Sequence, residues 1–134
     1  MRFDDWHLRL IEYLSFSARK AFQPGLHDCA LFSAGAVAAM TGVDFAANWR
    51  GRYTTLSGGA RLLRRAGHDD HIALAAACLK EIAPAFAAPG DLAVLPQGGA
   101  MVLGVVQGER VYVLTQNGLG LLHLSDAARA FRVN

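Results

Sequence analysis

The sequence predicts an α+β fold in which N-terminal helices, one of them central and buried, pack on a C-terminal antiparallel sheet of four to five strands. Helix patterns and helix-capping residues occupy the first part of the chain, up to about Ile82. From Asp91 the period becomes that of strands. A chain of 134 residues without a linker or an internal repeat is the usual size of one domain, so we expect a single domain over residues 1–134.

The first helix is predicted to begin after Asp4 or Asp5 and to run to about Ala18. Residues three and four positions apart share one helix face, and here that face carries Trp6, Leu10, Tyr13 or Leu14, and Ser17. A turn at Pro24-Gly25 then leads to the second helix.

The second helix is the predicted centre of the domain. Asp28 is a good N-cap, the segment from Cys29 to Met40 is almost wholly apolar, and Thr41-Gly42 supplies a stop. A helix that is apolar on every side belongs in the core. Cys29 therefore lies in a first turn, where unpaired N–H groups and the helix dipole favour a thiolate, whereas the charge of Asp28 opposes one.

Two further helices are predicted after an irregular stretch from Val43 to Leu56. One begins at Ser57, covers Ala60 to Ala66 and is closed by Gly67; the other runs from Asp70 or His71 to Ile82 and is stopped by Pro84. The second of these is rich in alanine, and Cys78 on it is expected to be a small, buried core residue.

The rest of the chain predicts an antiparallel sheet. Four Val- and Leu-rich segments are expected as strands, namely Asp91 to Leu95, Val102 to Val106, Arg110 to Leu114 and Gly120 to Leu124. Gln107-Gly108-Glu109 and Gln116-Asn117-Gly118 are typical of hairpin turns. Ser125 is expected to cap a helical turn through Ala130, and Phe131 to Val133 to return as an edge strand.

Composition restricts the classes of ligand. Hydrophobic residues make up 53% of the chain and charged residues 18%, which indicates apolar surface that meets a partner protein. A net charge of +2 does not predict nucleic acid or an anionic membrane as the main ligand. No signal-peptide pattern and no apolar run of about 20 residues is present, so we expect no membrane segment. Cys29 and Cys78 are expected to be reduced.

The cluster His68-Asp69-Asp70-His71 contains residue types that bind metals. A metal site usually needs a further ligand from elsewhere, and these residues fall where a loop and an acidic helix cap are predicted. We therefore favour the cap, and we expect neither a metal site nor a cofactor.

Basic and aromatic residues concentrate at Trp49, Arg50, Arg52 and Tyr53, with Arg61, Arg64 and Arg65 following. Charge with stacking is one way to bind phosphate or single-stranded nucleic acid, but the overall charge gives this little support. Because aromatic residues and arginine are enriched at interface centres, we favour a docking loop for another protein.

Several short motifs resemble known families. The series His27-Asp28-Cys29-Ala30-Leu31-Phe32 followed by Gly90-Asp91-Leu92 resembles the NlpC-type branch of the papain-like cysteine peptidases. Together with Thr41-Gly42-Val43-Asp44 and Arg50-Gly51-Arg52-Tyr53, the series resembles more narrowly a set of small proteins encoded among phage and prophage tail genes. The resemblance implies a papain-like NlpC-type fold, with Cys29 at the position of the nucleophile.

The resemblance also places the catalytic histidine, and here this sequence departs from it. In NlpC-type peptidases the histidine is at the start of a strand, just before a short apolar segment. That segment is matched here by Leu103-Gly104-Val105-Val106, so the histidine position falls on Val102, Met101 or Ala100. None of these accepts a proton. His123 reaches Cys29 only if Leu122 and Leu124 face away from the core, and His27 is expected at the mouth of the pocket rather than as a base.

Two functions follow as expectations. The first is a structural or assembly protein of a phage or prophage tail, at the tail tip or baseplate, that is made in the host cytoplasm and binds other tail proteins. Its peptidase fold would be degenerate. The alternative is an active cysteine peptidase or amidase that cleaves peptidoglycan peptides during DNA entry, with Cys29 as nucleophile and His123 or His27 as base.

Overall fold

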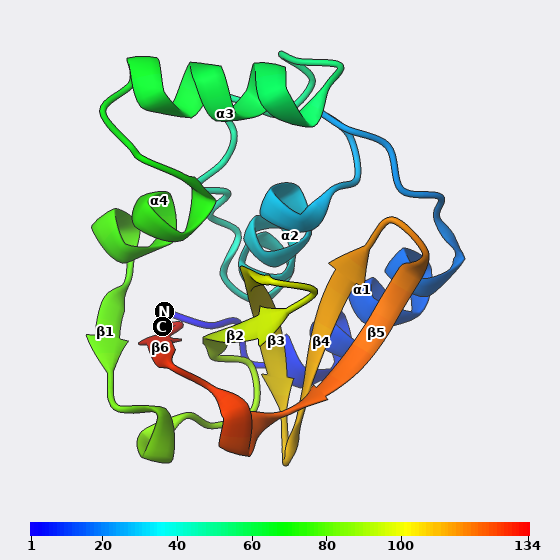
Figure 1. The fold of residues 1–134 in the computed structure, drawn as a ribbon. Helices are drawn as coiled ribbons and strands as arrows, with labels where there is room; N and C mark the ends of the chain where they lie inside the picture. Colours follow the sequence, from blue (N-terminus) through cyan, green and yellow to red (C-terminus); the bar gives the residue numbers. More distant parts are fainter.

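Four helices and a six-stranded antiparallel sheet make up the computed structural model, which describes residues 1–134 (Figure 1). The helices come first: α1 (Trp6–Arg19), α2 (Cys29–Thr41), α3 (Leu56–Arg65) and α4 (His71–Cys78). The strands are β1 (Lys80–Ile82), β2 (Leu92–Gln97), β3 (Ala100–Gln107), β4 (Arg110–Thr115), β5 (Gly118–His123) and β6 (Arg129–Arg132). Short 3₁₀ turns lie at η1 (Pro84–Phe86) and η2 (Leu124–Asp126). The predicted α+β class is confirmed.

The sheet has the strand order β1-β6-β2-β3-β4-β5, and every pairing is antiparallel. The prediction of four to five strands was wrong, because Lys80–Ile82 forms an additional strand instead of the end of a helix. β6 is consequently an interior strand, paired with β1 on one side and β2 on the other, and not the predicted edge. Lys80, Glu81 and Ile82 pair with β6, and the hydrogen bonds of this pairing favour a strand over the helix predicted for the end of the alanine-rich segment.

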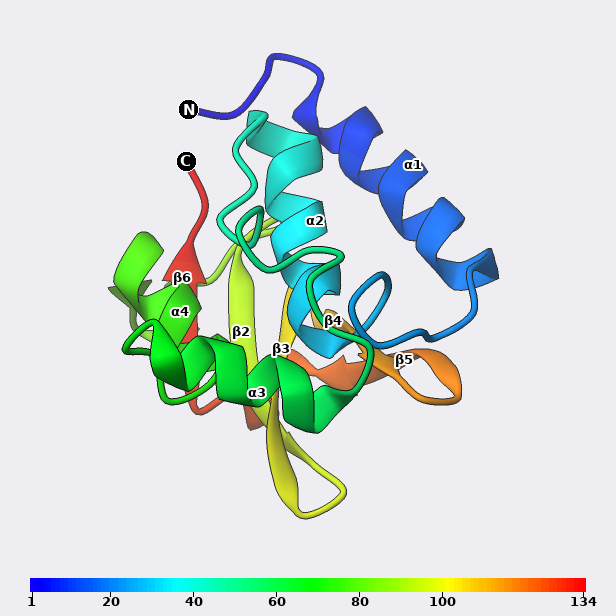
Figure 2. The same cartoon turned by 90° about the horizontal axis from the view of Figure 1, so that it is seen from above.

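The buried central helix is confirmed as α2. Asp28 caps it by accepting a hydrogen bond from the Leu31 N–H at 3.0 Å, and Gly42 ends it in the left-handed conformation at φ 80°. The helix packs on the sheet, where the Ser33 hydroxyl donates to the Leu103 carbonyl at 3.2 Å. Figure 2 shows α2 in the middle of the molecule, with α1 on one side and α3 and α4 on the other.

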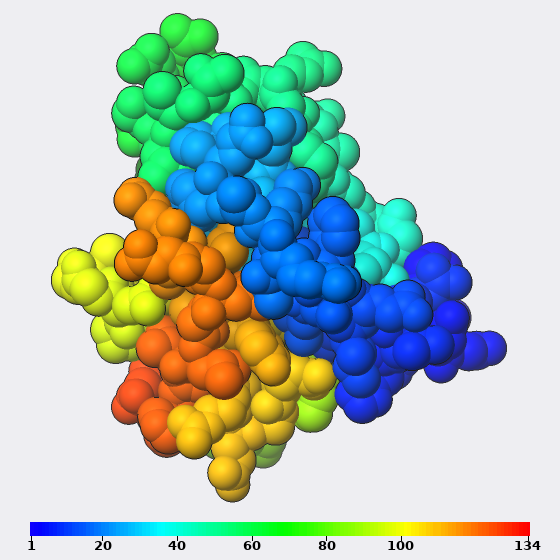
Figure 3. All heavy atoms as spheres, turned by 90° about the vertical axis from the view of Figure 1, so that its right-hand side faces the viewer, coloured from blue at the N-terminus to red at the C-terminus, as the bar shows by residue number.

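Helix α1 uses the predicted face. Leu10, Leu14 and Ser17 are buried, and the Tyr13 hydroxyl donates to the Phe32 carbonyl of α2 at 2.7 Å. Seen from the side (Figure 3), α1 lies in blue on the surface of the molecule and borders the orange β4–β5 hairpin.

Helices α3 and α4 differ from the predicted boundaries. Thr55, and not Ser57, caps α3 by accepting from the Gly58 N–H at 3.0 Å, so the helix begins several residues before Ala60. Asp70 caps α4 as predicted, through the Ala73 N–H at 2.8 Å. Cys78, at the end of the shortened α4, is exposed, and its predicted burial was wrong. Neither cysteine forms a disulfide.

The two ends of the chain meet at Asp91, whose side chain is almost fully buried. Its carboxylate accepts from the Arg2 guanidinium, the Val133 N–H and the Ala88 N–H, each at 3.0 Å. This one side chain therefore connects the N-terminus, the start of β2 and the C-terminus. None of the helices is both long enough and apolar enough to cross a membrane.

Candidate functional site

Asp28 organises the residues around the start of α2. It is completely buried, and one of its carboxylate oxygens caps the helix. The other oxygen accepts the Gly25 N–H at 2.8 Å and the Tyr53 hydroxyl at 2.6 Å. The irregular segment before α3 is thereby fixed against the first turn of α2, directly beside Cys29.

The Cys29 thiol is held in its protonated form. Burial raises its pKa first, and the like charge of Asp28 raises it further. The backbone N–H groups of Ala30 and Cys29 act in the opposite direction, because they face the sulfur at the helix start. Burial and the carboxylate prevail, so the expectation that Asp28 opposes a thiolate is supported.

A small cavity of about 180 Å³ lies next to the thiol. Its walls come from the start of α2, from α3 and from the start of α4, and they are mainly apolar. The lining residues are Asp28, Cys29, Ala30, Tyr53, Leu56, Gly59, Ala60, Leu63, Asp70 and His71. Helix α3 runs across this end of the molecule (Figures 1 and 2) and supplies most of the apolar wall.

His71 is the residue of this site that the sequence did not indicate. It is the first residue of α4, and its Nε2 is buried without a hydrogen-bond partner. Burial lowers its pKa, so the ring is neutral at pH 7. In the sequence it stands beside the capping Asp70, and only the packing of α4 against α3 and α2 brings it to the cavity that Cys29 also lines.

The two histidines weighed from the sequence lie elsewhere. His27 is buried beneath α1, where its Nε2 lies 3.3 Å from the Ser17 carbonyl and its ring meets Phe32 edge-on. Neither of these contacts directs the ring toward the thiol.

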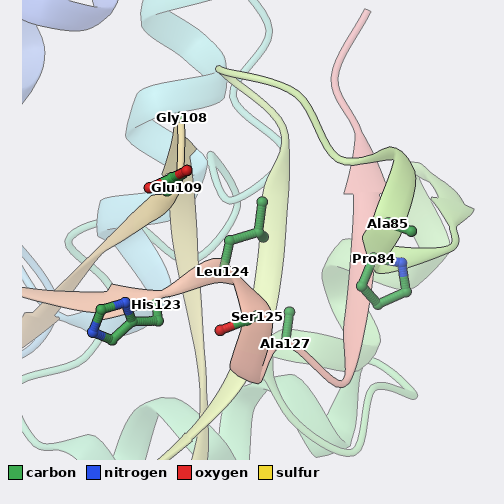
Figure 4. Close-up of a pocket in the computed structure, with 8 residues that line it drawn as sticks. All are labelled: Pro84, Ala85, Gly108, Glu109, His123, Leu124, Ser125 and Ala127. Atoms are coloured by element: carbon green, nitrogen blue, oxygen red, sulfur yellow. The ribbon is translucent and has the colours of Figure 1, made fainter.

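His123 is exposed at the end of β5, 2.8 Å from the Arg110 guanidinium, while Leu122 packs in a smaller apolar cluster on the face of the sheet away from α1 and α2. It borders a separate cavity of about 620 Å³, opposite Pro84 and Ala85 (Figure 4). That cavity and the one at Cys29 have no lining residue in common.

The strand position that the NlpC resemblance assigns to a histidine carries no base. Ala100 and Met101 are exposed at the start of β3, and Val102 packs among apolar side chains. Gly98-Gly99, just before them, form the β2–β3 turn with φ values of 59° and 81°.

In the predicted docking loop, some side chains contact other parts of the protein and others are exposed to solvent. Arg50 forms an ion pair with Asp44 at 2.8 Å, and Tyr53 is bound to Asp28. Trp49 is partly buried, with its ring edge-on to His68, while Arg52 is exposed. Three of the four residues therefore contact other side chains of the protein, and Arg52 alone is exposed.

The side chains from His68 to His71 are not arranged around one metal position. His68 packs on Trp49, Asp70 caps α4, and His71 enters the cavity at Cys29. No group of three or more His, Cys, Asp and Glu side chains in the chain is arranged to hold a metal ion.

Fold and site together define an α+β protein with a six-stranded antiparallel sheet and a cysteine at the start of its buried helix. Residues 1–133 match the family described as Domain of unknown function (DUF6950), and the chain belongs to this family. No curated protein matches the sequence.

Proposed function

We propose that the protein is a structural or assembly component of a phage or prophage tail, located at the tail tip or baseplate. In this proposal the fold is a degenerate NlpC-type papain-like fold that lacks the strand histidine of active peptidases. The sequence resemblance to small tail-gene proteins supports the tail assignment. The residues Ala100, Met101 and Val102, none of which accepts a proton, support the loss of the peptidase base.

The observation that carries an assembly role is the outer face of α1. Leu8, Ile11 and Phe16 are 57%, 47% and 56% exposed, on the side of the helix opposite Leu10 and Leu14. These apolar side chains stand among the exposed charged residues Arg9, Glu12 and Arg19, and a surface that mixes apolar and charged side chains is typical of one that meets another protein. The proposed occupants are other tail or baseplate proteins, and the proposed location is the virion tail after synthesis in the host cytoplasm.

Association with tail proteins tests this proposal. The tagged chain is co-expressed with the tail-tip and baseplate proteins of its genomic neighbours, and complexes are measured by pull-down and size-exclusion chromatography. We expect a complex that the double variant Leu8→Ser, Ile11→Ser weakens at least about tenfold, because it removes apolar contact area.

Phe86→Ser is the matched control, because Phe86 is 71% exposed in η1 and away from α1. It should leave the complex intact. A freely soluble monomer without affinity for any tail protein would contradict the assembly role.

A second candidate function is a cysteine peptidase or amidase acting on peptidoglycan peptides. What favours it is that the Cys29 cavity contains an imidazole, that of His71. Incubation of peptidoglycan with the wild type and with Cys29→Ala separates the two functions. Release of peptide fragments by the wild type alone supports the peptidase, and equal, negligible release by both excludes it.

A further inference from the structure

The cavity beneath α3 brings a thiol, an imidazole and a phenol hydroxyl together in apolar surroundings. Ala30, Leu56, Ala60 and Leu63 form its apolar part, and Cys29, His71 and Tyr53 contribute its polar atoms together with Asp28 and Asp70. Pockets for drug-sized ligands have volumes of about 300–1,000 Å³. At about 180 Å³ this cavity has room for a small group such as a short acyl chain.

The Nε2 of His71 makes no hydrogen bond within the fold. Buried polar atoms in native proteins nearly always have a hydrogen-bond partner, and leaving one without a partner costs about 1–3 kcal/mol. Nε2 of His71 has no hydrogen-bond partner. His71 is also not needed as the cap of α4, because Asp70 supplies that cap. The unpaired Nε2 at the wall of the cavity is therefore available to hydrogen-bond a group that enters the cavity.

At neutral pH Cys29 is a neutral thiol and His71 is a neutral imidazole, which are the forms that a nucleophile and its general base need before reaction. Burial lowers the pKa of His71, so at neutral pH its ring can accept a proton. Burial raises the pKa of Cys29, so the thiol keeps its proton until a base removes it. The two side chains are not hydrogen-bonded to each other in the unliganded protein, and such contacts often close only when substrate binds.

We propose that Cys29 and His71 form a nucleophile–base pair that accepts a small apolar acyl group from an ester or thioester. His71 Nε2 takes the proton of the Cys29 Sγ as the sulfur attacks the acyl carbon. The bond to the leaving oxygen or sulfur breaks, and that atom takes the proton back from His71. Water then attacks the acyl carbon as His71 takes its proton, the C–S bond breaks, the carboxylic acid leaves, and His71 returns the proton to the Cys29 Sγ.

The start of α2 contributes to this step. The N–H groups of Cys29 and Ala30 face the sulfur and have no partner within the helix, as at every helix start. They are therefore available to the negative charge that develops on the acyl oxygen. The ring of Tyr53, bound to Asp28 and in contact with α3 at Gly59, limits the length of the acyl group.

This inference goes beyond the proposed tail role and does not depend on it. It concerns the same thiol and imidazole as the peptidase candidate, but it assigns them a small acyl ester or thioester as substrate and requires no peptide. Retention of tail-protein binding by Cys29→Ala separates failure of the acyl site from failure of the assembly role.

The test uses p-nitrophenyl acetate, butyrate and decanoate with the full chain carrying Cys78→Ser, which removes the exposed second thiol. Nitrophenolate release and intact-protein mass are followed together. We expect one acyl group on Cys29, with acetate and butyrate reacting much faster than decanoate. His71→Gln should slow acylation by about 100-fold or more, the usual contribution of a general base.

His68→Gln is the matched control, because His68 packs on Trp49 outside the cavity, and it should leave the rate unchanged. Equal acylation rates in wild type, His71→Gln and Cys29→Ala would overturn the proposal. If His71→Gln fails to fold, the pH profile of the Cys78→Ser chain decides. A rate that rises below the ordinary histidine value of 6.5 and is level from there to the ordinary thiol value of 9.0 supports His71 as base. A rate that rises only above 6.5 contradicts it.

Discussion

At the scale of single residues, Asp28 combines two roles that oppose each other chemically. Its carboxylate caps α2 and holds Tyr53, which stabilises the fold around the cavity. The same negative charge raises the pKa of the neighbouring Cys29 and lowers the fraction of thiolate. Stability and thiol reactivity are therefore in conflict at this position.

Asp28→Asn should separate these effects. Asparagine can still cap α2 through its Oδ1, and the charge beside the thiol is removed. Its NH₂ group cannot accept the Gly25 N–H, so we also expect a loss of stability at that contact. Because the pKa of Cys29 then falls, its alkylation by iodoacetamide at pH 8 should become roughly threefold to tenfold faster. The measurement uses the Cys78→Ser chain. Asp126→Asn, on exposed η2, is the control and should leave the rate unchanged; an unchanged rate in Asp28→Asn would show that the carboxylate does not act on the thiol.

His71 makes the stability of the fold sensitive to acid. Because burial lowers its folded-state pKa below the ordinary value of 6.5, the unfolded chain binds its proton first as the pH falls. The free energy of unfolding should therefore decrease from pH 7.5 to pH 5.5. His27, whose pKa burial also lowers, acts in the same direction, while the charges of Asp28 and Asp70 partly offset the effect at His71.

Urea unfolding at a series of pH values measures this dependence. His71→Gln should flatten the curve between pH 6.5 and pH 5.5 without abolishing the slope, since His27 remains. His68→Gln should retain the wild-type curve. An identical slope in His71→Gln and wild type would mean that His71 is solvated in the folded state.

At the scale of elements, α3 is held over the cavity by a close contact. A Cβ atom at Gly59 would lie 2.7 Å from the Tyr53 ring, so this glycine permits the ring to lie flat against the helix. The Tyr53 hydroxyl then reaches Asp28 at 2.6 Å. The position of α3 thus depends on one small residue and one hydrogen bond to a buried charge.

Gly59→Ala should destabilise the protein even though alanine favours helices by about 1 kcal/mol over glycine. Displacement of Tyr53 weakens its hydrogen bond to Asp28, and overpacking typically costs about 1–3 kcal/mol, so we expect a net loss of about 1 kcal/mol in urea unfolding. In a Tyr53→Ala background, where no ring is present to clash, the same substitution should stabilise. Stabilisation in both backgrounds would refute the contact.

At the scale of the whole molecule, Asp91 joins the two ends of the chain to the sheet. Asp91→Ala leaves the Val133 and Ala88 N–H groups without their acceptor and removes the partner of Arg2. We expect the free energy of unfolding to fall by about 3 kcal/mol, measured with urea. Glu81→Ala removes an exposed ion pair with Arg129 and is the control, which should change little. Similar small losses in both variants would contradict the role of Asp91.

The sequence predicted the elements with strong local signals. Asp28 and Gly42 set the limits of α2 in advance, and the Gly-containing turns set the hairpins, because caps and tight turns depend on a few neighbouring residues. The segment Leu79–Ile82 was wrongly predicted as helix because it has no such local signal. Its structure depends on pairing with β6, about 50 residues away, as in Lys80 with Arg132.

For the candidate site, the sequence alone determined Cys29 at the start of a buried helix, its acidic neighbour and the absence of a base at the expected strand position, since each follows from adjacent residues or local spacing. Only the tertiary structure decided which imidazole accompanies the thiol. His71 reaches the cavity because α3 and α4 fold back over the end of α2, and that approach of distant segments is set by packing of the whole chain.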